Sequence, residues 1–170
     1  MSSARSRSTH PDAVDVIIDQ WKRELPELAS ENMALIGRLR RCSILLAPRL
    51  DEVFAAHDLS NGAFDVLATL RRAGAPYILT PTELFASLMV TSGTMTTRLQ
   101  NVQKRGWVER IPNPDDARSM LVKLTGAGRE LVEKVVFEHV ENERRILEKL
   151  PAETRRQLDA GLAELMRVLE

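Results

Sequence analysis

The sequence has little of what secreted and membrane proteins need. It contains a single cysteine, Cys42, which cannot form an internal disulfide. No apolar run reaches the roughly 20 residues of a membrane-spanning helix, and the N-terminus lacks the apolar core of a signal peptide. These absences exclude a transmembrane protein and predict a cytoplasmic one. Because Cys42 lies in a long helical pattern without a resolving partner, we interpret it as a small buried hydrophobe rather than an oxidation sensor.

The sequence also lacks an excess of charge of either sign and any arrangement typical of an enzyme. Its 24 lysines and arginines balance 24 acidic residues, so the overall charge does not indicate a nucleic-acid partner. No nucleophile–base pair, phosphate-binding loop or metal-ligand spacing is present. His10, His57 and His139 are scattered, and we interpret them as surface residues. We therefore expect no catalytic residue, no metal and no cofactor.

Helix signals are strong from Thr80 onward. Thr80 suits the N-cap of a helix, Pro81 suits its first position, and Glu83 completes a capping box. A short turn leads to a second helix that ends before Gly106, a residue suited to a left-handed cap. Two helices joined by a short turn are typical of a helix-turn-helix, whose second helix enters the DNA major groove. The apolar stripe of this second helix consists of Met95, Leu99 and Val102.

A β-hairpin pattern follows directly. Residues 107–111 have strand composition, residues 112–116 are a cluster of turn formers, and residues 120–124 suit a returning strand. Arg118 lies on the returning side, where a guanidinium can enter the DNA minor groove, and we expect Asp116 to pair with it and orient it. A helix-turn-helix followed by a hairpin is a winged helix-turn-helix. We therefore predict a mainly α-helical fold with a small β-hairpin wing.

The second helix of the pair carries side chains suited to DNA. Its first turn holds no carboxylate, which leaves its amide-rich N-terminus free for a phosphate, and short hydroxyl side chains allow a close approach to base edges. The charges between Thr91 and Arg105 are all positive. The alternative is a solvated helix face in a protein-interaction module that does not bind DNA. The predicted DNA-binding residues are Ser92, Thr94, Thr96, Thr97, Arg98, Asn101 and Arg118.

Several short segments between residues 79 and 129 resemble the MarR (multiple antibiotic resistance regulator) family of bacterial transcription factors. Trp107 stands where a leucine is expected, which we attribute to packing under the hairpin. The resemblance implies a DNA-binding transcriptional regulator, most often a repressor, rather than an enzyme. The segments that carry it are Leu79–Leu84, Ser92–Leu99, Arg105–Arg110, Pro114–Arg118 and Leu124–Arg129.

Helical patterns flank the winged-helix segment on both sides. We divide the chain into a disordered tail at 1–10, N-terminal dimerisation helices at 11–57, the winged helix-turn-helix at 58–125 and C-terminal dimerisation helices at 126–170. The apolar stripes of the flanking helices find no partner in a small winged-helix core, so a second copy is the simplest one. Similar proteins are homodimers with interlocking terminal helices. Two recognition helices would then reach major grooves about 34 Å apart, which predicts an inverted-repeat operator.

An extra first helix, roughly Asp12–Glu24, resembles the PecS or urate-responsive branch of that family. This branch binds urate through a tryptophan on the first helix, an aspartate on the helix before the turn and an arginine on the recognition helix. The matching positions are Trp21, Asp65 and Arg98. An anionic purine would pair with Arg98, stack on Trp21 and repel Asp65, which would displace the recognition helix. Ala73 stands where the branch has a polar residue, so a phenolic carboxylate or an oxidant is the alternative signal.

Overall fold

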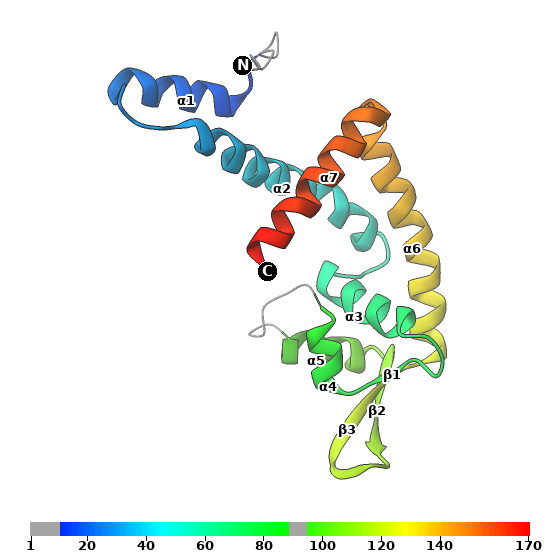
Figure 1. The fold of residues 1–170 in the computed structure, drawn as a ribbon. Helices are drawn as coiled ribbons and strands as arrows, with labels where there is room; N and C mark the ends of the chain where they lie inside the picture. Colours follow the sequence, from blue (N-terminus) through cyan, green and yellow to red (C-terminus); the bar gives the residue numbers. More distant parts are fainter. Residues whose placement is uncertain (1–10, 89–94) are drawn as a thin grey trace. The chain divides into compact units, whose positions relative to one another are not determined.

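The computed structural model describes residues 11–88 and 95–170 and consists of helices with a small antiparallel sheet (Figure 1). The chain divides into two compact units, Met1–Pro48 and Arg49–Glu170. Within the described ranges, no helix combines the length and the apolar character needed to cross a bilayer. The predicted class, a mainly α-helical fold with a small β wing, is confirmed.

In the first unit, helix α1 (Ala13–Glu24) is tied to the N-terminal part of α2 (Glu31–Ala55). Asp12 caps α1, and Asp15 completes a capping box with it. The guanidinium of Arg38 on α2 donates to both carboxylates, at 2.7 and 2.5 Å. These hydrogen bonds lower the pKa of both carboxyl groups, so the link between the two helices is fully charged at neutral pH.

The core of the second unit gathers around helix α3 (Asn61–Arg72). Ser60 caps its N-terminus. The apolar side chains of Phe64, Leu67 and Leu70 on this helix are all buried. Full burial of side chains of this size stabilises a fold by about 1.5–3 kcal/mol each. Helix α3 is therefore a rigid platform for the elements that pack on it.

Helices α4 (Pro81–Ala86) and α5 (Met95–Lys104) are the two arms of the helix-turn-helix. The predicted capping box of α4 is present: the hydroxyl of Thr80 accepts from the amide of Glu83 at 3.1 Å, and the Glu83 carboxylate accepts from the amide of Thr80 at 2.8 Å. The predicted cap of α5 falls at positions 91 and 92, outside the described residues. The start of α4 at Pro81 and the end of α5 before Gly106 agree with the helix signals in the sequence.

The sheet has three antiparallel strands in the order β1-β3-β2, namely β1 (Ile78–Leu79), β2 (Val108–Asn113) and β3 (Asp116–Leu124). The β2–β3 hairpin is the predicted wing. Its strands are longer and its turn shorter than expected, because positions 112, 113 and 116 pair within the ladder. Strand β1 was not predicted, since two residues are too few to show the alternation by which a strand is recognised.

Helices α6 (Gly126–Leu147) and α7 (Ala152–Leu169) complete the second unit. Helix α6 packs on the core through Val132 and Val135, whereas α7 buries no residue at all. Large apolar side chains on both helices are exposed within a single chain. A second copy that covers them stays a prediction. These exposed residues are Phe137, Val140, Leu147, Leu158, Leu162, Met166, Val168 and Leu169.

Two interpretations made from the sequence are wrong. Cys42 is exposed rather than buried, because α1 covers only part of α2. His57 and His139 are not surface residues, since their side chains are only 13% and 17% exposed. His57 pairs with Glu138 at 2.6 Å, and His139 lies against two phenylalanine rings. The sequence did not show which side of α6 meets the end of α2.

Candidate functional site

Helix α5 is the predicted DNA-reading element, and its burial pattern fixes its orientation. Leu99 and Val102 are 1% and 0% exposed, which anchors the helix in the core. Thr96, Thr97 and Asn101 are exposed. The first turn of the helix contains no acidic residue, so no carboxylate there competes with a DNA phosphate for the helix N-terminus. The exposed side of α5 thus has the polar, acid-free character that DNA contacts need.

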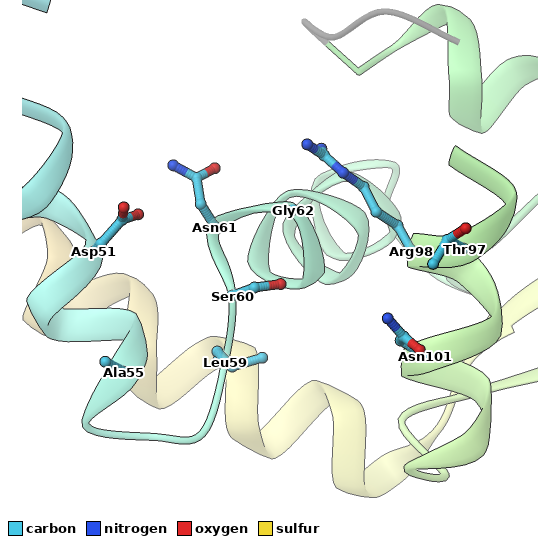
Figure 2. Close-up of a pocket in the computed structure, with 9 residues that line it drawn as sticks. All are labelled: Asp51, Ala55, Leu59, Ser60, Asn61, Gly62, Thr97, Arg98 and Asn101. Atoms are coloured by element: carbon cyan, nitrogen blue, oxygen red, sulfur yellow. The ribbon is translucent and has the colours of Figure 1, made fainter. Parts of the chain in front are cut away.

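Arg98 extends from α5 across the first turn of α3 (Figure 2). The contact is so close that a Cβ at Gly62 would stand 2.4 Å from Nε and 2.5 Å from Cζ of Arg98. Glycine in a helix costs about 1 kcal/mol relative to alanine, so a glycine at this place has to be explained by its surroundings. The missing side chain of Gly62 makes room for the guanidinium. We call this arrangement of Gly62 and Arg98 the arginine seat.

Asp65, one turn further along α3, is the counter-ion of Arg98. Nη1 of Arg98 lies 3.7 Å from Oδ2 of Asp65, an ion pair longer than a direct hydrogen bond. The predicted ion pair between α3 and α5 is therefore confirmed. Burial raises the pKa of the Asp65 carboxyl group, against the opposing effect of the nearby positive charges of Arg98 and Arg72. Among the described residues, Nη1 of Arg98 is buried without a hydrogen-bond partner, which leaves it able to donate to a ligand.

Helix α3 also holds the first arm of the helix-turn-helix. Nη2 of Arg72 donates to the carbonyl oxygen of Ser87, the C-cap of α4, at 2.6 Å. The last carbonyl groups of a helix lack intrahelical partners and carry partial negative charge, so a guanidinium stabilises them. Helix α3 thus contacts α4 through Arg72 and α5 through Asp65. A change in the charge around Asp65 can act on both arms.

A cleft of about 490 Å³ opens beside the arginine seat. Figure 2 shows the end of α2 on one side of the cleft, α5 on the other side, and the α2–α3 loop with the start of α3 between them. The volume falls in the range of small-molecule sites, and Arg98 is the one cation among the described residues that line the cleft. Arg98 therefore gives the cleft one group that can bind the anionic part of a ligand. Its lining consists of Asp51, Ala55, Leu59, Ser60, Asn61, Gly62, Thr97, Arg98 and Asn101.

The tip of the wing presents Arg118 to solvent. Oδ1 of Asp116 accepts from the backbone amide of Arg118 at 3.0 Å, and the side-chain amide of Asn113 donates to Ser119 at 2.8 Å. The expected ion pair between Asp116 and Arg118 does not form, because the carboxylate is used to close the turn through the backbone. Within the described part of the chain, the Arg118 guanidinium has no ionic partner, so it is free to contact DNA.

Close contacts at its base fix the wing on α6. The hydroxyl of Thr125 donates to the carbonyl groups of Gly106 and Trp107 at 2.8 and 3.0 Å. A Cβ at Gly128 would stand 2.1 Å from the carbonyl oxygen of Trp107, so only glycine fits there. The Trp107 ring packs against the core and lies 5.0 Å from the Arg105 guanidinium, in agreement with its expected packing role. The direction of the wing is therefore set by backbone contacts.

The structure brings part of the predicted DNA-binding set to the cleft. Thr97, Arg98 and Asn101 line it, so residues expected to contact DNA also face a candidate ligand site. Ser92 and Thr94 lie outside the described residues. DNA contact by this set stays a prediction, and the shared position of three of its members next to a cleft was not foreseen.

The predicted ligand residues are divided between the two units. Trp21 lies on α1 in the first unit and is 39% exposed, whereas Asp65 and Arg98 belong to the second unit. A ligand site common to all three stays a prediction. Two residues beside the cleft were missed: Asp51 belongs to no motif, whereas Gly62, a glycine just after a helix cap, was an available signal. In the described ranges, no three potential ligand side chains are grouped as a metal site requires.

Known proteins resemble this chain in sequence and in fold. The model of the MarR family matches residues 57–119. The HTH-type transcriptional regulator PecS of Dickeya dadantii (strain 3937) is 43% identical over 152 residues, which cover 89% of this chain and 92% of the relative. A putative MarR-like transcription regulator from Bacillus cereus ATCC 10987 has a TM-score of 0.75 at 25% identity, over 84% of this chain and 100% of that chain. A mutant MarR from Escherichia coli in complex with operator DNA has a TM-score of 0.68 at 30% identity, over 82% of this chain and 99% of that chain.

Proposed function

We propose that this protein, which belongs to the MarR family, regulates transcription by binding operator DNA and releases the DNA when a small anionic aromatic ligand enters the cleft beside Arg98. The arginine seat is the observation that carries the proposal. Arg98 belongs to the DNA-reading helix, contacts Gly62 and Asp65 of α3, and lines the cleft. A ligand that engages Arg98 therefore acts directly on the position of α5. The family is one of transcriptional regulators, which confirms the expectation that the chain is not an enzyme.

DNA recognition is assigned to α5 and the β2–β3 wing. The acid-free first turn of α5, its exposed hydroxyl side chains and the exposed Arg118 on the wing support this assignment. The E. coli relative that was solved with operator DNA shares the fold and 30% of the aligned sequence. In the proposal, α5 lies in the major groove and the wing reaches the minor groove. The contacting residues are Ser92, Thr94, Thr96, Thr97, Arg98, Asn101 and Arg118.

A homodimer is the proposed active form. Each unit leaves large apolar side chains uncovered within one chain, among them Leu35 and Ile44 in the first unit and Phe137 and Leu169 in the second. Many large exposed apolar side chains on one helix are typical of a surface that a partner covers. Interlocked terminal helices from residues 11–57 and 126–170 would cover it. The two-fold axis then predicts an inverted-repeat operator. The resemblance to the family supports a repressor, and binding to a bacterial chromosome would place the protein in the cytoplasm.

Ligand release follows from competition for Arg98. A planar anion can form paired hydrogen bonds with the guanidinium and replace the long contact with Asp65. Its negative charge then faces Asp65, whose carboxylate is already disfavoured by burial. Relief of this repulsion separates α3 from α5 and alters the spacing of the recognition helices, so the ligand and DNA favour different states. Urate as the ligand and Trp21 as its stacking ring follow from the resemblance of the sequence to the urate-responsive branch, and a phenolic carboxylate is the alternative.

The DNA contact is tested by fluorescence anisotropy with the variant Arg118→Ala. Loss of a guanidinium from the groove should weaken binding about tenfold across sequences and reduce the dependence on salt. Arg155→Ala removes the same charge from an exposed position on α7 and should leave the affinity unchanged. Equal affinities for wild type and Arg118→Ala would remove the wing from the DNA interface.

A further inference from the structure

The cleft beside Arg98 contains a carboxylate as well as a guanidinium. Asp51, on the last turns of α2, lines the side of the cleft that faces α5 and Arg98 (Figure 2). The carboxylate of Asp51 is exposed, and within the described part of the chain it has neither a hydrogen bond nor an ion pair. An acid opposite the one cation is unfavourable for a site that binds simple anions. Asp51 is therefore a candidate for selecting between ligands.

We infer that Asp51 determines the chemical class of ligand, so that the cleft favours a planar heterocycle with ring N–H donors in addition to an anionic edge. This inference rests on the proposed function, in which the cleft holds the effector. At neutral pH a carboxylate only accepts hydrogen bonds, whereas a guanidinium only donates them. A ring with an anionic edge and an N–H edge satisfies Arg98 and Asp51 together.

The rest of the lining does not make this distinction. The side-chain amides of Asn61 and Asn101 and the hydroxyl of Thr97 each donate and accept, so they fit either kind of ligand. Arg98 attracts any anion, since its buried Nη1 has no hydrogen-bond partner among the described residues. A phenolic carboxylate gains at Arg98 but is repelled by Asp51. An anionic purine gains at both residues, and the charge of Asp51 is thus the property that separates the two classes.

The test is isothermal titration of the full chain with urate and with salicylate, in the wild type and in Asp51→Asn. Removal of the carboxylate should weaken urate binding about tenfold, because a hydrogen bond to a charged group is lost. The same change should strengthen salicylate binding, because a repulsion is removed. Glu52→Gln neutralises the neighbouring exposed acid, which does not line the cleft, and should change neither affinity. A loss of urate affinity together with a gain of salicylate affinity distinguishes selection by Asp51 from general damage to the site, which would weaken the binding of both ligands.

A second comparison uses the ligand in place of the protein. An N-methylated urate keeps the planar ring but has fewer N–H donors, so it should bind the wild type more weakly than urate does. In Asp51→Asn this penalty should be smaller, since the two changes remove the same interaction. Unchanged urate affinity in Asp51→Asn, or an equal loss for urate and salicylate, would overturn the role of Asp51. Wild-type protein that binds neither anion would overturn the proposed effector site, and the inference with it.

Discussion

Gly62 is the residue on which the arginine seat depends. Any side chain at this position would occupy the space of the Arg98 guanidinium. The backbone there is helical, so alanine would fit the local conformation and would favour the helix more than glycine does. The glycine is thus unfavourable for the isolated helix and is explained by the contact between α3 and α5.

The variant Gly62→Ala should displace Arg98 without removing its charge. Because the displaced atoms are the far end of a flexible side chain, we expect an unfolding temperature no lower than that of the wild type. The effect of urate on DNA affinity, measured by anisotropy, should fall about tenfold, since the ligand loses a fixed hydrogen-bond partner. Gly126→Ala, where a Cβ meets nothing within 4 Å, is the matched control. A full urate response in Gly62→Ala would contradict the role of the seat.

Asp65 should make stability depend on pH. Burial raises the pKa of its carboxyl group, so the folded protein binds a proton more readily than the unfolded chain does. The ionised carboxylate therefore lowers stability at neutral pH, and this loss disappears as the pH falls through the raised pKa. Asp65→Asn should unfold at a higher temperature than the wild type at pH 7, by an amount that shrinks on acidification toward the ordinary value of 3.8. If the difference in unfolding temperature between Asp65→Asn and the wild type grew on acidification, the pKa of Asp65 would be lowered in the folded protein rather than raised.

At the scale of the elements, the base of the wing is held by close contacts between the start of α6 and the backbone at Gly106 and Trp107. In Gly128→Ala, a Cβ 2.1 Å from the carbonyl oxygen of Trp107 would force the start of α6 away from the residue that precedes β2. We expect a loss of about 3 kcal/mol in the free energy of unfolding, measured with urea. Gly126→Ala lies two residues earlier in open space and should be close to neutral. Equal stability of the two variants would mean that the wing does not depend on this contact.

The sequence predicted the elements with local signals and missed those without them. The caps at Ser60 and Thr80 and the glycine at 106 define helix ends by local chemistry, and the structure has helices at these places. Strand β1 and the length of the wing strands depend on pairing with β3, which no local pattern shows. The cleft combines Asp51 of α2 with Arg98 of α5, and only tertiary packing brings them together. The exposure of Cys42 was missed because a helical stripe does not reveal how much of it a neighbour covers.

At the scale of the whole molecule, the uncovered apolar side chains call for a second copy. Leu162 lies on the leucine stripe of α7, a helix that buries no residue within one chain. The variant Leu162→Asp should shift the mass measured by light scattering from that of a dimer toward that of a monomer. Binding to an inverted repeat should weaken, because each half-site must then bind a separate monomer. Ala160→Asp adds the same charge to the opposite face of the helix and should remain dimeric. A dimer that survives Leu162→Asp unchanged would place the interface elsewhere.

The central claim is that one side chain, Arg98, links a ligand site to DNA binding. Its most direct test is fluorescence anisotropy of the full chain on labelled DNA from upstream of its own gene, with urate titrated into the complex. We predict salt-sensitive binding that urate reverses in the wild type, whereas the complex of Arg98→Ala resists urate. Wild-type DNA binding that urate leaves intact, or equal reversal in Arg98→Ala, would contradict the account.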